Sequence, residues 1–174
     1  MSIQINTITN DIFEGESLQP DCRWATELEG QAYLLQKAKQ SKIAELEAFH
    51  DSPAVKTLTV NGVHKVSMLS NQRMLLREQI ALMEDQVKFA QIQQGQTIDI
   101  NTLVWNFKLE NNGFVPLNYL ALVAISTKIM AITNPNFTTR QTHIDAINAL
   151  TTIDEVNNYD FTAGYILNQN INLV

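Results

Sequence analysis

The chain has 174 residues, of which 45% are hydrophobic and 17% are charged, and 18 acidic against 12 basic residues give a formal charge of −6. This length suits one domain, or one small domain with an appendage, and is enough to bury a sizeable core. The acidic balance disfavours unaided binding to nucleic acid, because affinity for a phosphate backbone comes largely from Lys and Arg. Cys22 is the only cysteine, which excludes an internal disulfide and any zinc site built from several cysteines.

No apolar run reaches the length needed to cross a bilayer. The most apolar window, Tyr119 to Ile132, carries Ser126, Thr127 and Lys128 and is better explained as a buried helix. The N-terminus has neither the basic nor the continuous apolar region of a secretory signal. We therefore expect no membrane partner and a chain made in the cytosol.

The N-terminal residues 1–22 are predicted to form an arm. Residues 2–8 alternate apolar and polar side chains, as in one short strand, and the following stretch contains Gly15, Pro20 and several acids. A strand with no partner of its own is a candidate for pairing with a sheet edge of another chain, and a frayed terminus is the alternative.

Residues 23–50 predict a long helix, because they are rich in Ala, Leu, Glu, Gln and Lys and contain no proline. Asp51-Ser52-Pro53 ends it, since the residue before a proline disfavours helical backbone angles. Lys39 and Lys42 interrupt its apolar stripe, so two alternatives stay open: packing at both ends on the rest of the domain, or a small coiled coil between copies. The candidate oligomer contacts on this stripe are Leu28, Leu35, Ile43, Leu46 and Phe49.

A tight hairpin is predicted between residues 57 and 68. Asn61-Gly62 is the preferred pair for a type I′ turn, in which both central residues need positive φ. A two-residue loop places Val60 opposite Val63. In that register one face, expected to be buried, holds Leu58, Val60 and Val63, and the other holds Thr57, Thr59, His64 and Val66.

The next helix is expected to start at Ser70 as N-cap and to end at Gly95. Its apolar stripe favours core packing over an oligomer seam, with a gap at Arg73. The stripe consists of Leu69, Leu76, Ile80, Met83, Val87 and Ala90.

A second hairpin follows between residues 103 and 117. Its first strand has one strongly apolar face, and Asn111, Asn112 and Gly113 turn the chain back into a short strand that Pro116 confines to an edge. The apolar face consists of Leu103, Trp105, Phe107 and Leu109.

The C-terminal third is predicted to be helical and interrupted. Asn118 caps a helix that ends near Thr133, because Asn134-Pro135-Asn136 breaks it. Thr138 with Gln141, and then Thr152 with Glu155, have the spacing of capping boxes and predict two further helix starts. A polar tail closes the chain.

No stretch has the local signature of a catalytic, cofactor or metal site. His143 and Asp145 are two residues apart on a predicted helix and diverge around it, whereas ligands on one face are three or four apart. His50 at a helix end, His64 on the hairpin and Cys22 are best explained by structural roles. A hydrolase with an unrecognised site is the least favoured alternative.

Three runs of sequence resemble an uncharacterised domain found in many bacteriophage tail-fibre and tail-associated proteins. The resemblance covers roughly residues 30–165 and rests on three shared patterns. The first is a V-x-G hairpin, and the second is a strand with a tryptophan that leads to an Asn-Gly turn and then to V-P-L-N, where a strand passes into a helix. The third is I-x-A-L-T-T followed by Y-D near the end of the domain. The proline near residue 135 departs from that family, whose corresponding helix is usually uninterrupted. The runs are TVNGVHKVSML, LVWNFKLENNGFVPLNYLALV and HIDAINALTTIDEVNNYDFTAGY.

The sequence thus predicts a mainly helical α+β fold with long helices, two small β-hairpins and an N-terminal arm and helix. Its parts are the arm at 1–22, the helix at 23–50, a helix-hairpin module at 54–165 and a tail at 166–174. The structural turns are Asn61, Gly62, Asn112 and Gly113.

The resemblance implies a non-enzymatic structural protein of the virion, made in the host cytoplasm and located in the tail. Its expected partners are other tail or fibre proteins and, as an open alternative, copies of itself. The alternative function is a tail-fibre assembly chaperone that does not remain in the virion.

Overall fold

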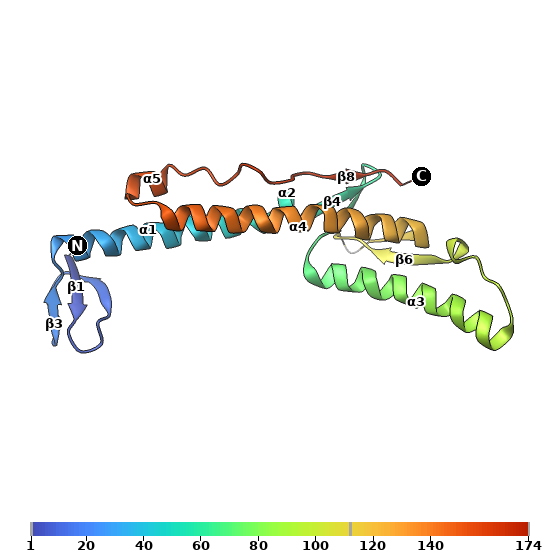
Figure 1. Cartoon of the computed structure of the whole chain (residues 1–174), viewed down its shortest axis with the longest axis horizontal. Coiled ribbons are helices and arrows are strands. Elements are labelled where there is room, and N and C mark those ends of the chain that lie inside the picture. Colours follow the sequence, from blue (N-terminus) through green and yellow to red (C-terminus); the bar gives the residue numbers. More distant parts are fainter. Residues whose placement is uncertain (1, 112, 174) are drawn as a thin grey trace. The chain divides into compact units, whose positions relative to one another are not determined.

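The computed structural model describes residues 2–111 and 113–173 and is α+β, with 54% helix and 19% strand, as predicted. Its three long helices are α1 (Glu27–His50), α3 (Ser70–Gln94) and α4 (Tyr119–Ala149), accompanied by small sheets (Figure 1). The chain divides into two compact units. The first unit comprises Met1–Glu47 and Thr142–Phe161, and the second comprises Ala48–Gln141 and Thr162–Val174.

A three-stranded antiparallel sheet forms the start of the first unit. Strand β1 (Ser2–Asn6) lies between β2 (Ile12–Gly15) and β3 (Cys22–Trp24), so the expectation of an arm without a partner strand was wrong. The chain reverses twice, with Asn10 in the loop before β2 and Asp21 in the loop before β3. These residues adopt positive φ angles of 62° and 60°, which Asn and Asp tolerate better than most residues.

Buried Gln4 of β1 fastens the loop that joins β2 to β3. Its Nε2 donates to the Ser17 carbonyl at 2.7 Å, and its Oε1 accepts from the Gln19 N–H at 3.0 Å. Gln4 therefore fixes the loop between β2 and β3 to strand β1.

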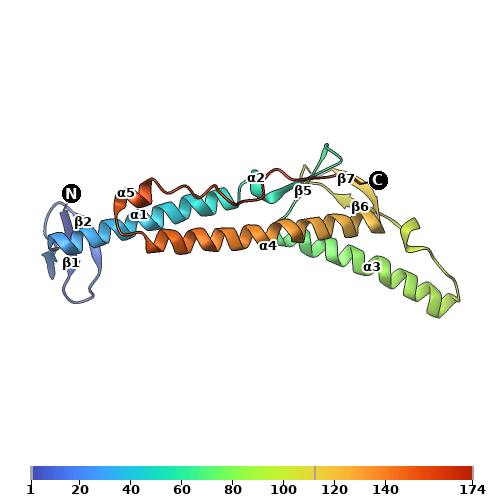
Figure 2. The same cartoon turned by 45° about the horizontal axis from the view of Figure 1, so that its top comes forward.

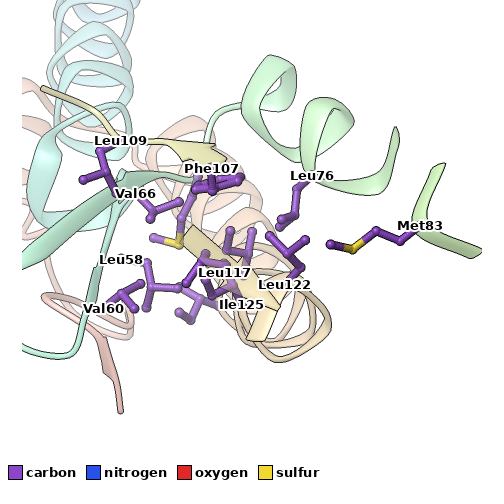
Figure 3. Packing of buried hydrophobic residues seen from close by; sticks show 13 residues of the cluster. Leu58, Val60, Val66, Leu76, Met83, Phe107, Leu109, Leu117, Leu122 and Ile125 are labelled. Carbon is purple, nitrogen blue, oxygen red and sulfur yellow. The ribbon is translucent and has the colours of Figure 1, made fainter. Parts of the chain in front are cut away.

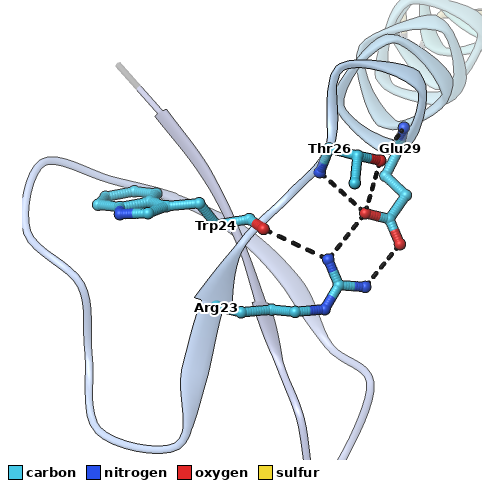
Figure 4. Close-up of polar contacts among 4 residues, drawn as sticks. All are labelled: Arg23, Trp24, Thr26 and Glu29. Atoms are coloured by element: carbon cyan, nitrogen blue, oxygen red, sulfur yellow. Dashed lines mark hydrogen bonds and ion pairs between the residues drawn. The ribbon is translucent and has the colours of Figure 1, made fainter.

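Helix α1 begins at Glu27 and not at residue 23, because the residues up to Trp24 belong to β3. Thr26 and Glu29 form a capping box: the Glu29 N–H donates to Thr26 Oγ1 at 3.3 Å, and the Thr26 N–H donates to Glu29 Oε2 at 2.9 Å. Figure 4 shows Arg23 completing this arrangement, with its guanidinium donating to both carboxylate oxygens at 2.8 and 2.6 Å.

These contacts lower the pKa of Glu29 from 4.5 to about 2, chiefly through the Arg23 hydrogen bond and then through Thr26. A carboxylate with a depressed folded-state pKa stabilises the fold above its unfolded pKa, and this contribution is lost as pH falls from about 4.5 toward 2. We expect a carbon-13 NMR titration of Glu29 to give a midpoint near 2 in the folded chain and a higher one in Arg23→Gln. Lys88→Gln, on another helix, serves as the control; an unchanged midpoint in Arg23→Gln would refute this assignment.

The core of the second unit joins both hairpins to α3 and α4. Figure 3 shows side chains from β4, β5, β6, β7, α3 and α4 meeting at one place. Its buried members are Leu58, Val60, Val66, Met68, Leu76, Met83, Phe107, Leu109, Leu117, Leu122, Ile125, Ile129 and Ile132.

The first hairpin follows the short helix α2 (Pro53–Lys56) and consists of β4 (Thr57–Val60) and β5 (His64–Ser67). Asn61 and Gly62 have φ angles of 52° and 71°, as the predicted turn requires. The register prediction was wrong, because β4 pairs Val60 with His64 and the loop includes Val63. A shift of one residue turns the second strand over, so Val66 is buried in place of Val63, which is 75% exposed.

The C-terminal residues are not a free polar tail. Strand β8 (Asn170–Ile171) pairs in parallel with β4, which makes β4 the central strand of a three-stranded sheet. Ile171 and Leu173 pack against the core, and the Leu173 N–H donates to Asn61 Oδ1 at 2.6 Å. The turn residue Asn61 thus also anchors the end of the chain.

Helix α3 ends at Gly95, whose φ of 61° confirms the predicted left-handed cap. At its start the N-cap is Leu69 and not Ser70, and Leu69 offers no side-chain hydrogen bond to the first turn. A 3-10 turn, η1 (Ile100–Thr102), then leads into the second hairpin.

Strands β6 (Val104–Lys108) and β7 (Phe114–Asn118) form the second hairpin, and Pro116 lies on an edge strand, as predicted. The Leu109 N–H donates to the Gly113 carbonyl at 2.8 Å, and the Gly113 N–H donates to Asn111 Oδ1 at 3.1 Å. Asn112, the middle one of the three predicted turn residues, lies outside the described residues.

Helix α4 continues through Pro135, so the predicted break and the helix start at Thr138 were wrong. Asn118 caps it as predicted, accepting from the Ala121 N–H at 2.9 Å. After α4, the capping box of Thr152 and Glu155 starts α5 (Ile153–Asn157), as the sequence predicted. Figure 2 shows α5 followed by the extended C-terminal segment.

Candidate functional site

The apolar stripe of α1 is partly used inside the chain. Leu46 is fully buried, and Phe49 makes an edge-to-face contact with Tyr165 at a centroid distance of 5.3 Å. Leu28 is 77% exposed, while Leu28 and Leu35 line a shallow hollow with residues 151–154. Ile43 is half-buried. The C-terminal end of this stripe thus takes part in packing within the chain, which leaves Leu28 as its most accessible member.

Basic residues of α1 contact groups within the first unit. Lys37 forms an ion pair with Glu14 at 2.6 Å, Lys39 donates to the Asn148 carbonyl at 2.7 Å, and Lys42 pairs with Glu45 at 3.0 Å. These three lysines therefore all have polar partners within the first unit.

The residues considered for catalysis or metal binding lie in different parts of the structure. Cys22 is in β3, His64 is in β5, and His143 Nδ1 lies 2.8 Å from the Tyr159 hydroxyl. Within residues 2–111 and 113–173, no group of three or more His, Cys, Asp or Glu side chains is placed to hold a metal ion.

Helix α3 has a second apolar face that points away from the core. Leu75, Leu82 and Phe89 are seven residues apart and lie along one side, and their exposures range from 41% to 59%. Met74 and Ile92 flank them and are also exposed. Leu75, Leu82 and Phe89 each directly precede a buried residue of α3, so they lie about 100° around the helix from the side that faces the core. Met74 and Ile92 lie about 160° from that side. The sequence stripe identified only the core side.

A cavity of about 490 Å³ lies in the second unit, where α2, α3 and α4 approach one another. Its polar wall includes Lys56, whose Nζ lies 2.8 Å from His50 Nε2 and 3.7 Å from Asp51 Oδ1. Met68, Leu69 and Phe137 form the apolar part of the wall. The remaining lining residues are Ser70, Arg73, Thr133, Asn134 and Thr138.

Two buried polar atoms of this wall, Arg73 Nε and Thr133 Oγ1, have no hydrogen-bond partner among the described residues. Burial lowers the pKa of Lys56 from 10.5, Asp51 opposes this effect, and the positive charges of Arg73 and Arg140 add to it. Sequence reasoning missed this cavity, because its residues come from three distant segments. The one local signal was Arg73, which interrupts the apolar stripe of its helix.

None of the described helices is both long enough and apolar enough to cross a membrane. Residues 37–163 match the family model of DUF4376, a domain of unknown function. No curated protein and no solved structure matches the chain. Since the family match covers most of the chain, the protein belongs to the DUF4376 family.

Proposed function

We propose that this protein is a non-enzymatic structural subunit of a bacteriophage tail or tail fibre that acts through protein–protein contacts. The tail context is supported by the motif resemblance around TVNGVHKVSML and VPLNYLALV. In this proposal the chain is made in the host cytoplasm, is incorporated in the tail of the virion and contacts other tail or fibre proteins.

The main support for binding to another protein is the outward face of α3. This face is defined by Met74, Leu75, Leu82, Phe89 and Ile92. Single exposed hydrophobic residues are ordinary, but a row of large ones along one helix is typical of a surface that binds a partner. The side of α3 about 100° around the helix from Leu75 and Leu82 holds Leu76 and Met83 in the core. The helix is therefore fixed at its inner side and presents its outer side to a partner.

Acidic substitutions on this face test the proposal. In the phage that encodes the chain, we expect Leu82→Asp and Phe89→Asp together to reduce incorporation into particles at least about tenfold, because a charge on a buried contact is costly. Incorporation is measured by quantitative mass spectrometry of purified particles, with thermal unfolding to show that the variant folds.

Leu120→Asp is the matched control, since Leu120 is an exposed leucine of α4 at 58% and an acid is favourable in the first turn of a helix. This control should be incorporated like the unmodified chain. Normal incorporation of the α3 variant would refute α3 as the contact surface. Absence of the unmodified chain from particles, together with binding to a fibre protein in lysates, would favour the assembly chaperone instead.

A further inference from the structure

We propose that the cavity between α2, α3 and α4 is a binding site for a small phosphorylated molecule, whose phosphate group contacts Lys56, Arg73 and the N-terminus of α3. This inference goes beyond the proposed contact function and involves a different surface.

The donors for an anion come from two different helices. Lys56 ends α2, Arg73 lies in the first turn of α3, and Leu69 and Ser70 bring the helix N-terminus to the same wall. Leu69 has no side-chain group to cap the first-turn N–H donors. The Gln72 N–H donates to Asn71 Oδ1 at 2.8 Å, so the first-turn donors proposed for the phosphate are those of Ser70 and Asn71. The start of a long helix carries a partial positive charge and exposed N–H groups, both of which favour a phosphate.

The unpartnered atoms point to the same chemistry. Arg73 Nε is a buried donor without a partner among the described residues, and Thr133 Oγ1 in the same wall is a second buried polar atom of this kind. Such groups are rare in folded proteins, because a buried donor without an acceptor loses its hydration without compensation. An oxyanion in the cavity offers acceptors to the guanidinium and to the hydroxyl group.

The local charge is opposite to that of the whole chain. The positive charges of Arg73 and Arg140 both act on Lys56, and Asp51, whose side chain is 68% exposed, forms an ion pair with Lys56 at 3.7 Å. The chain as a whole carries a net charge of −6. The pKa of Lys56 is lowered mainly by burial and further by the two arginines, so a bound dianion would relieve this repulsion.

The size and lining of the cavity indicate more than a bare ion. A volume of about 490 Å³ falls within the range of small-molecule sites. Met68, Leu69 and Phe137 provide an apolar wall beside the cationic one. This combination fits a phosphomonoester with a small organic part.

Calorimetric titration of the full chain with inorganic phosphate and with glycerol 3-phosphate, at matched ionic strength, tests the site. We expect saturable binding of both probes, and tighter binding of glycerol 3-phosphate would identify the ester as the preferred form. Arg73→Gln is expected to weaken binding by about tenfold or more, since hydrogen bonds to charged groups are among the strongest. Amide resonances of Ser70 and Asn71 should shift on titration.

Lys88→Gln is the control, because Lys88 is an exposed lysine of the same helix, is paired with Asp85 at 3.2 Å and does not line the cavity. It removes one positive charge, as Arg73→Gln does, and should leave affinity unchanged. Lys56→Gln provides a second test from another element if Arg73→Gln does not fold. Lack of saturable binding by the unmodified chain, or equal loss in Lys88→Gln, would overturn the proposal.

Discussion

Replacing Phe107 with alanine is expected to lower the free energy of unfolding by about 3–5 kcal/mol. Phe107 is 1% exposed, lies in β6 and belongs to the cluster that joins both hairpins to α3 and α4. Removing the ring takes apolar surface from the core and leaves a cavity that its neighbours fill only in part. Urea unfolding followed by circular dichroism measures the change.

Phe114→Ala is the control for this prediction, because it makes the same substitution on the same hairpin. Phe114 is 66% exposed in β7, opposite Lys108, so its loss should change stability by only about 0.5 kcal/mol. Similar costs at the two positions would contradict the placement of Phe107 at the centre of the core.

The second large effect is expected at Asn136. Its side chain is 2% exposed and bonds to one residue twice: Nδ2 donates to the Ile166 carbonyl at 3.0 Å, and Oδ1 accepts from the Ile166 N–H at 2.7 Å. Asn136→Ala leaves both backbone groups without these partners, and we expect a loss of about 2–4 kcal/mol. Faster hydrogen exchange of the Ile166 amide would locate the effect.

Asn134→Ala serves as its control, since Asn134 is exposed on the same helix and alanine has the higher helix propensity. Little change or slight stabilisation is expected for this variant. If Asn136→Ala unfolds like the unmodified chain, Asn136 does not anchor the C-terminal segment.

Local chemistry was enough to predict several features of this fold. Asn61-Gly62 marked a turn, Gly95 marked a helix end, and Thr152 with Glu155 marked a helix start, because each depends on neighbouring residues. The register of the first hairpin was wrong by one residue. That error arose because the Asn-Gly pair does not show whether Val63 belongs to the loop or to the strand.

Features that depend on distant partners were not predictable in the same way. The segment 170–171 appeared to be a polar tail, and its partner β4 lies more than a hundred residues earlier in the chain. Gln4 is a polar residue of the predicted strand, yet its side chain is buried and bonds to the loop that joins β2 to β3. Neither contact leaves a periodic pattern in the sequence.

Pro135 shows tertiary structure overriding a local rule. A proline inside a helix removes one hydrogen bond and costs about 3 kcal/mol or more. Ile129, Ile132 and Asn136 are all buried on the helix around it, and their spacing of three and four keeps one face toward the core and the Ile166 segment. Packing along this face offsets the cost, so the helix continues through Pro135.

The candidate site was predictable only in part. The stripe of α1 was found from periodicity, but Leu46 and Phe49 turned out to pack inside the chain. The outward row of Leu75, Leu82 and Phe89 on α3 also repeats every seven residues. It was not predicted, because the stripe that faces the core was enough to explain why this segment forms a helix. The cavity depends on Lys56, Arg73 and Thr133, which only the fold brings together.

Cross-linking mass spectrometry of purified phage particles tests whether the outward face of α3 binds a tail protein. We expect the chain to be present in the particles, and cross-links from Lys88, beside Phe89 on α3, to reach another tail or fibre protein. Particles that lack the chain, or that contain it without any cross-link from this side of α3, would contradict the proposed role in the tail.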